Sequence, residues 1–281
     1  MKKLIFLTIS LFLVIGTSFG QFISAKEFMD LYKTGNVIVV DADRPSNYAG
    51  THVKNSVNIW TAEYFVKGQP DGLLLPKDEL VAFFGSKGLS EDATIVMYDD
   101  GSNKYTSRLY FALKYVGAKD VRILHKDMNE WQKVRIPLNN TVPKIAPAVF
   151  NPTAESPIMI DIAYLKANAN KDNLMVFDVR ADKEYVGEDG KSLGHLPGSI
   201  LMDYKDVLLA NGDFKSKDQL QELADKYGIT AEKEIIFYCN SGVKAAVNFI
   251  AFHDILGFPN VKVLDGGYNH WILDKENAIV K

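Results

Sequence analysis

Short runs of β-branched and apolar residues alternate with amphipathic stretches along most of the chain. The runs at 37–43, 94–100 and 121–125 are each expected to form a buried strand. Between the first two, residues 77–89 place leucine and phenylalanine at helical spacing among lysine and glutamate, which predicts an amphipathic helix. A second set follows in the same order, with strands at 174–180, 234–240 and 261–265 and a helix at 215–229. Strands that alternate with helices predict an α/β fold, a mostly parallel sheet with helices on both faces.

The two sets are copies of one unit. An offset of 140 residues pairs Tyr98 with Tyr238 and Trp131 with Trp271 without a gap. Upstream, residues 37–59 match residues 174–200, where the second copy carries an insertion before its Gly-His pair. Because register over such distances rarely arises by chance, we expect two homologous domains in tandem.

The predicted domain boundaries follow from the repeat and from a proline-rich stretch. The first domain is expected to span residues 21–140 and the second residues 158–281. Residues 138–157 contain four prolines and show no clear periodicity, so we expect an interdomain linker at 141–157.

The N-terminus has the three parts of a secretory signal peptide. Lys2 and Lys3 precede a short apolar run, and small residues follow around Ser18 and Gly20. We therefore expect residues 1–20 to be a signal peptide cleaved near Gly20, and the protein to be exported to the periplasm without stable membrane association. An uncleaved N-terminal anchor is the alternative.

Composition and charge restrict the kinds of molecule that the protein is expected to bind. The 281 residues carry a formal net charge of −3 and no cluster of lysine and arginine, which argues against a nucleic-acid partner. A single cysteine and scattered histidines lack metal-ligand spacing, so neither a metal nor another cofactor is expected. We expect a monomer that acts on small molecules.

The single cysteine, Cys239, ends a predicted strand just before a predicted helix. Gly242 lets the backbone between them curl, so that several N–H groups can point toward one centre. Such a loop at a helix N-terminus favours a thiolate over a thiol and predicts a nucleophile. The expected loop consists of Cys239, Asn240, Ser241, Gly242, Val243 and Lys244. The structural alternative is that Cys239 is a small buried hydrophobic residue.

The first copy has no nucleophile at this place. Asp99 stands opposite Cys239 in the repeat, and an aspartate cannot act as a sulfur nucleophile. We therefore expect the first domain to be catalytically inactive and Asp99 to cap a helix.

Taken together, these features resemble the two-domain rhodaneses, the thiosulfate and 3-mercaptopyruvate sulfurtransferases. The resemblance covers about residues 22 to 280 and is carried by Asp178, Arg180 and the segments 194–200, 239–245 and 263–271. It implies that Cys239 takes a sulfur from a donor as a persulfide. The persulfide, cradled by loop amides, then passes this sulfur to cyanide or a thiol.

Residues of the loop and of the segment before it bear on which sulfur donor is used, thiosulfate or 3-mercaptopyruvate. Ser241 is similar to the serine of the mercaptopyruvate enzymes, and the resemblance implies a relay of Ser241, His52 and Asp43. Against this donor, Glu184 and Glu188 replace the two arginines by which those enzymes bind a carboxylate, which favours thiosulfate.

Two cations are candidates for substrate binding, Arg180 and Lys244. The structural alternatives are that Arg180 pairs with a buried carboxylate and that Lys244 is a solvated lysine. For His52 the alternative is a purely structural Gly-His turn, because His195 occupies the matching place in the second copy without a cysteine nearby.

Two rival functions were weighed. A cysteine phosphatase requires an arginine where this chain has Ala245, so its phosphate clamp is missing. A non-enzymatic persulfide carrier or binding protein is an alternative of another class, and catalytic turnover distinguishes it from an enzyme.

Overall fold

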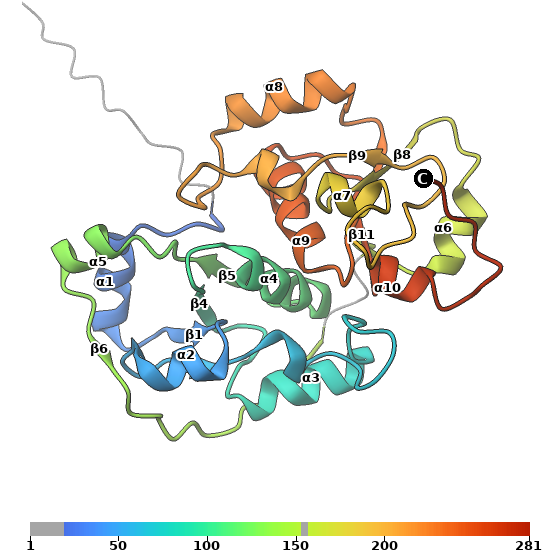
Figure 1. The fold of residues 1–281 in the computed structure, drawn as a ribbon. Helices are drawn as coiled ribbons and strands as arrows, with labels where there is room; N and C mark the ends of the chain where they lie inside the picture. The colour runs from blue at the N-terminus through green and yellow to red at the C-terminus, as the bar shows by residue number, and fades with distance from the viewer. Residues whose placement is uncertain (1–19, 153–156) are drawn as a thin grey trace, which may run out of the picture.

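The computed structural model describes residues 20–152 and 157–281 (Figure 1). The expected signal peptide therefore lies outside the described residues, apart from Gly20. Within the described part of the chain, no helix is long and apolar enough to cross a membrane.

The first domain follows the predicted order of strands and helices. Its strands are β1 (Ile38–Asp41), β2 (His52–Val53), β3 (Val57–Asn58), β4 (Thr94–Tyr98), β5 (Asp120–Ile123) and β6 (Leu138–Asn139). Its helices are α1 (Ala25–Thr34), α2 (Pro45–Gly50), η1 (Thr61–Glu63), α3 (Lys77–Ser86), α4 (Lys104–Val116) and α5 (Met128–Val134).

The second domain repeats this order. Its strands are β7 (Met159–Ile160), β8 (Leu174–Asp178), β9 (Ile200–Leu201), β10 (Glu234–Tyr238) and β11 (Val261–Leu264). Its helices are α6 (Ile162–Asn168), α7 (Asp182–Tyr185), η2 (Tyr204–Val207), α8 (Lys217–Tyr227), α9 (Val243–Phe249), the π-helical η3 (Ile250–Ile255) and α10 (Gly267–Trp271).

Each domain contains a parallel sheet, as predicted. The strand order is β3-β1-β4-β5 in the first domain and β7-β11-β10-β8-β9 in the second. Because all strands of a parallel sheet point the same way, the loops that follow β4 and β10 lie at the carboxyl edge of their sheets, where ligands of such folds bind.

Alternation along the strands divides the apolar residues among three clusters. In β10, Ile236 and Tyr238 face a cluster confined to the second domain, together with the buried Trp271. Ile235 and Phe237 face the opposite side, where one continuous cluster joins both domains, and Cys239 continues this side. The parity of β10 therefore directs Cys239 toward the first domain.

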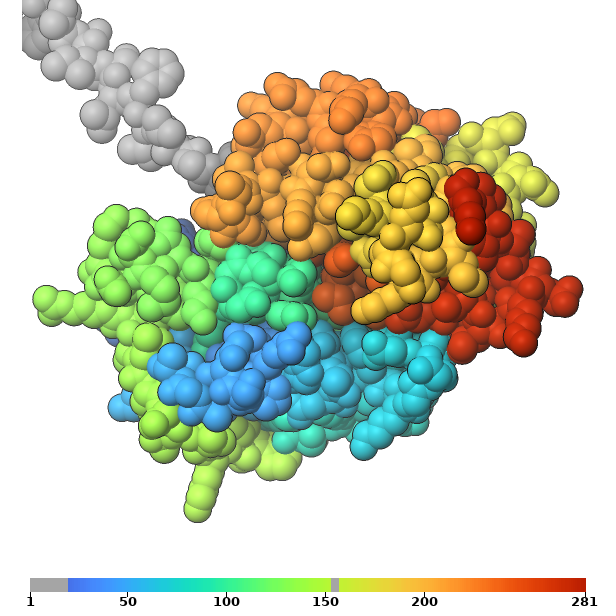
Figure 2. Space-filling view, viewed as in Figure 1, coloured from blue at the N-terminus to red at the C-terminus, as the bar shows by residue number. Residues whose placement is uncertain are grey.

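The domains pack through equivalent elements. Helix α4 lies against α9 (Figure 1). The rings of Phe111 and Phe249 contact each other between these helices, with 5.1 Å between their centroids. In the space-filling view the two halves of the chain meet along an extended boundary (Figure 2).

Two glycines related by the repeat allow the closest approaches between the domains. A Cβ on Gly72 of the first domain would lie 2.2 Å from the Cβ of Ser241, and one on Gly212 of the second would lie 2.2 Å from the carbonyl oxygen of Gly101. Because both glycines also have positive φ, each position favours glycine. Each domain therefore presses one loop against the loop at the carboxyl edge of the other sheet.

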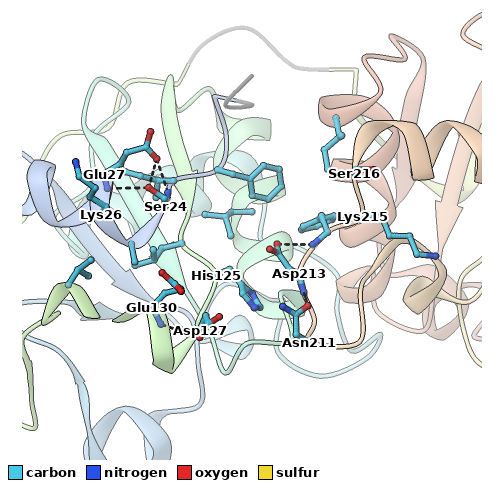
Figure 3. A pocket seen from close by; sticks show the side chains of 18 residues that line it. Ser24, Lys26, Glu27, His125, Asp127, Glu130, Asn211, Asp213, Lys215 and Ser216 are labelled. Atoms are coloured by element: carbon cyan, nitrogen blue, oxygen red, sulfur yellow. Dashed lines mark hydrogen bonds between the residues drawn. The ribbon is translucent and has the colours of Figure 1, made fainter. Parts of the chain in front are cut away.

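A pocket of about 550 Å³ opens elsewhere along the domain boundary (Figure 3). Ser24, Glu27 and His125 of the first domain line one side, and Asn211 and Asp213 of the second line the other. Cys239 does not line this pocket, so we describe it as part of the domain boundary.

Candidate active site

Cys239 follows β10 directly and is 2% exposed. Helix α9 begins four residues later, at Val243, as predicted, and Gly242 precedes it with φ of +83°. A β-carbon at Gly242 would be strained there, because L-residues rarely adopt this backbone conformation. Glycine at this position therefore makes the tight curl between strand and helix possible.

The loop is held from its own domain by the start of α10. The carbonyl oxygens of Cys239 and Asn240 accept hydrogen bonds from the amides of Tyr268 (2.8 Å) and Asn269 (3.0 Å). A Cβ on Gly267 would lie 2.1 Å from the carbonyl oxygen of Cys239, so only glycine permits this approach. The carbonyls of the loop are thereby turned away from the cavity and its curvature is fixed.

A cavity of about 450 Å³ lies in front of the loop. The second domain contributes five residues of the predicted loop to its lining: Cys239, Asn240, Ser241, Val243 and Lys244. The first domain contributes the remaining lining residues: Arg44, Trp60, Thr61, Ala62, Phe65, Asp71, Lys104 and Tyr105. The cysteine thus opens on a space that both domains build.

In the first copy, a carboxylate occupies the equivalent loop. Asp99 Oδ1 accepts from the amides of Gly101 (2.9 Å) and Asn103 (3.1 Å), and Oδ2 accepts from the amides of Tyr105 (3.0 Å) and Thr106 (3.3 Å). Burial raises the pKa of Asp99, and these hydrogen bonds act in the opposite direction. The prediction that Asp99 caps a helix is confirmed.

This comparison shows what the loop can hold. Asp99 demonstrates that a strand-loop-helix unit of this sequence directs several amides at one buried carboxyl group. Across the described part of the chain, no side-chain oxygen accepts from the amides of residues 240–245 in the second copy. The loop of Cys239 therefore has donors available for an anion on sulfur.

Lys244 lines the cavity but is paired. Its Nζ lies 3.2 Å from Glu184 Oε2, and Asn240 donates to Glu184 Oε1 at 2.6 Å. Burial would raise the pKa of Glu184, but hydrogen bonds from Ala181 N–H and Asn240 and the charge of Lys244 outweigh it and hold this pKa below its usual value. Glu184 thus stays ionised near neutral pH and offsets the charge of Lys244. Glu188, the other unexpected glutamate, is exposed and does not line the cavity.

The prediction that Arg180 binds substrate is wrong. Its side chain is fully buried, and Nε and Nη2 bond to the carboxylate of Asp178 at 2.6 to 3.0 Å. Nη2 also donates to the carbonyl oxygen of Gly194, and the guanidinium lies 4.0 Å from the ring centroid of Tyr268. These contacts occupy the guanidinium, so Arg180 pairs with a buried carboxylate, as the structural alternative stated.

The structure also contradicts the relay of Ser241, His52 and Asp43. The His52 ring is 1% exposed, and its two nitrogens face the carbonyl oxygens of Tyr48 (2.6 Å) and Thr141 (3.2 Å). His195 repeats the contact in the second copy through the carbonyl of Tyr185 (3.0 Å), and each histidine stacks on its tyrosine. The Gly-His turn is therefore structural in both domains, and the cavity contains Ser241 but neither His52 nor Asp43.

Sequence reasoning missed Arg108, a fully buried residue of α4. Its Nη2 lies 2.6 Å from Asp265 Oδ1 of the second domain and donates to the carbonyl oxygen of Gly72 at 2.9 Å. A Cβ on Gly242 would lie 2.8 Å from Arg108 Nη1, so this guanidinium packs against the loop of Cys239. The repeat offered one signal, because the position equivalent to Arg108 in the second copy is Asn248.

Comparison with known proteins agrees with this architecture. The model of the rhodanese-like domain matches the chain twice, at residues 24–134 and 161–274. The chain therefore belongs to the rhodanese-like family, as predicted, and the predicted sulfurtransferase class is confirmed by its relatives.

Three of the similar proteins show the range of names and of sequence identity among them. A putative thiosulfate sulfurtransferase of Haloferax volcanii is 27% identical over 248 residues, which cover 84% of this chain and 85% of the relative. A probable 3-mercaptopyruvate sulfurtransferase of Pseudomonas aeruginosa is 29% identical over 206 residues, 72% of each chain. The crystal structure of a 3-mercaptopyruvate sulfotransferase from Escherichia coli has the same fold, with a TM-score of 0.77, 21% identity, and coverage of 89% of this chain and 99% of that one.

The pairing of Glu184 with the loop gives a pH prediction. A carboxylate with a depressed folded-state pKa contributes stability that is present above its unfolded pKa and is lost as pH falls through the folded value. We expect the free energy of unfolding of wild type to fall more steeply below about pH 4.5 than that of Glu184→Gln. Denaturant titrations from pH 3 to pH 7 check this, and parallel profiles would contradict it.

Proposed function

We propose that this sulfurtransferase moves the sulfane sulfur of thiosulfate to a thiophilic acceptor, cyanide or a thiol, through a persulfide on Cys239. The observation that carries the proposal is the pair of equivalent loops. Asp99 fills one of them with a carboxylate, whereas Cys239 leaves the other open toward a cavity. An anionic persulfide on Cys239 would occupy the place that the Asp99 carboxylate takes in the first copy.

The two half-reactions balance without a cofactor. The Cys239 thiolate attacks the outer sulfur of thiosulfate, a new S–S bond forms, and the old S–S bond breaks as sulfite leaves with the electron pair. The acceptor then attacks the terminal sulfur of the persulfide, and the electron pair of that bond returns to Cys239 as the thiolate. Loop amides stabilise the negative charge on sulfur in both steps. Among the described residues no group of three or more His, Cys, Asp and Glu could hold a metal.

3-Mercaptopyruvate is the second candidate donor. Ser241 lines the cavity beside Cys239, and the similar protein of Pseudomonas aeruginosa carries the name of that activity. Glu184 stands where the resemblance expects an arginine that binds the carboxylate of 3-mercaptopyruvate, so this chain lacks that contact, and Glu184 pairs with Lys244 instead. We therefore favour thiosulfate.

Mass spectrometry of the intact chain tests the proposal. After brief exposure to thiosulfate, wild type is expected to gain one sulfur atom that cyanide or dithiothreitol removes, and Cys239→Ser is expected to gain none. Initial rates with the two donors then rank them, with thiosulfate expected to be faster. A wild type that gains no sulfur from either donor would rule out the mechanism. One sulfur accepted per chain without repeated release to a small acceptor would identify a carrier instead.

We further propose that the protein is exported and works in the periplasm, on the support of the N-terminal sequence. Lys2 and Lys3 precede an apolar run that is short for a membrane span. N-terminal sequencing of protein isolated from the periplasmic fraction checks this, and a mature chain that begins near Gln21 is the expected result.

A further inference from the structure

We propose that Arg44 and Lys104, both from the inactive first domain, bind the oxyanion headgroup of the sulfur donor. This inference rests on the proposed function and adds the substrate-binding residues to it. Both side chains line the cavity that contains Cys239, and both are contributed by the first domain. The first domain would thereby retain a role in catalysis although Asp99 has replaced its nucleophile.

The charge balance of the cavity points to these two residues. Of its three cationic side chains, Lys244 is paired with Glu184 at 3.2 Å. Neither Arg44 nor Lys104 forms an ion pair with any carboxylate in residues 20–152 or 157–281. Asp71 also lines the cavity. Asp71 and Arg44 are both exposed to solvent, which screens their charges alike, whereas Lys104 is half-buried. With Lys244 offset by Glu184, Arg44 and Lys104 outnumber Asp71, so the lining keeps a net positive charge, which suits an anionic donor.

Both cations lie on aromatic rings. The guanidinium of Arg44 lies 5.5 Å from the ring centroid of Trp60, and Lys104 Nζ lies 5.2 Å from that of Tyr105. The two rings contact each other edge to face at 4.6 Å. Contact with a ring face favours a cation at that place and restricts its side chain. The cations are thus held at adjacent positions on one wall of the cavity.

The sequence around Arg44 fixes its backbone. Arg44 precedes α2, and Pro45 begins the helix. The Asp43 carboxylate accepts from the Arg44 amide at 2.6 Å and from the side chain of Asn47 at 3.0 Å. Asp43, expected to take part in a proton relay, is therefore a positioning residue for Arg44.

A planar guanidinium can donate two parallel hydrogen bonds to a sulfonate-like or carboxylate group, while an ammonium acts as a point charge. Thiosulfate and 3-mercaptopyruvate share an oxyanion that this pair can bind, and they differ in charge. Loss of both cations is therefore expected to weaken the binding of thiosulfate, a dianion, more than the binding of 3-mercaptopyruvate, a monoanion.

Binding and loading are measured separately in the test. Thiosulfate is titrated calorimetrically into Cys239→Ser and into the same protein with Arg44→Gln, Lys104→Gln or both, because this background cannot accept sulfur. Each neutralisation is expected to raise Kd roughly fivefold to tenfold, and the double change more. Arg44→Lys is expected to restore only part of the affinity, because an ammonium supplies the charge without the two parallel hydrogen bonds. Lys119→Gln is the matched control, because Lys119 precedes β5 and is exposed at the amino edge of the sheet, away from the cavity.

The persulfide assay on the Cys239 protein completes the test. The thiosulfate concentration for half-maximal loading is expected to rise in the same ratio, while the final level stays at one sulfur per chain, and the effect with 3-mercaptopyruvate is expected to be smaller. Absence of loading in wild type would refute the proposed function and leave the binding result to decide this inference. The inference is overturned if Kd in the double variant is within twofold of Lys119→Gln, or if Cys239→Ser does not bind thiosulfate at all.

Discussion

Sulfur transfer is expected to fall by roughly 10³-fold or more when Cys239 is replaced by serine. The serine hydroxyl is not ionised near neutral pH, and its oxygen cannot form the persulfide on which both half-reactions depend. Because Cys239 is the only cysteine of the sequence, no neighbouring thiol can replace it. Steady-state assays with thiosulfate and cyanide measure the loss.

The serine variant should otherwise behave as wild type. Its side chain is slightly smaller than that of cysteine, and the strand end remains anchored by the amides of Tyr268 and Asn269. We expect the two proteins to unfold at nearly the same denaturant concentration. Retention of more than a tenth of the wild-type rate by a folded serine variant would show that sulfur does not pass through Cys239.

The second large effect is expected at Arg108, because it forms a buried ion pair between the domains. Arg108→Met leaves Asp265, only 5% exposed, without its cation. Removing one partner of a buried pair costs about 3–5 kcal/mol of unfolding free energy. Since the same guanidinium packs against Gly242, we also expect slower persulfide formation. Chemical denaturation and single-turnover loading measure the two effects.

A double-mutant cycle provides the control. Asp265 also accepts from the amide of Leu74 at 3.0 Å, and an asparagine in its place can still accept that hydrogen bond. Arg108→Met combined with Asp265→Asn is therefore expected to recover part of the stability, because the uncompensated charge is removed. Strictly additive losses in the cycle, or a loss below about 1 kcal/mol in Arg108→Met, would show that the ion pair contributes little.

Prediction from sequence succeeded where local pattern decides structure. The order of strands and helices, the parallel sheets and the placement of Cys239 before a helix that begins at Val243 are all confirmed. So is the capping role of Asp99, because the repeat placed it at the start of an equivalent helix. Each of these depends on side-chain periodicity or on residues close in the chain.

Prediction failed at residues whose roles depend on distant partners. Arg180 and His52 were assigned to the site by analogy, but the carboxylate of Asp178 and the carbonyl of Tyr48 take up their polar atoms. Arg44 and Lys104 were not singled out, because nothing local distinguishes a cavity-lining cation from a solvated one. Arg108 pairs with a residue 157 positions away, and although the repeat sets Arg108 apart from Asn248, no local pattern indicates which residue it pairs with.

By itself, then, the sequence determined the duplicated α/β unit and the position of its single cysteine between a strand and a helix, since these depend on local periodicity. Alternation along β10 then sets the face on which Cys239 lies. The tertiary structure decided which residues pack around Cys239. It packed the first domain against the second, placed Gly72 and Arg108 against the loop of Cys239, and brought Arg44 and Lys104 to the cavity in front of Cys239. The reason is physical: the chemistry at Cys239 depends on charges and contacts contributed across the domain boundary, and these exist only once both cores have joined.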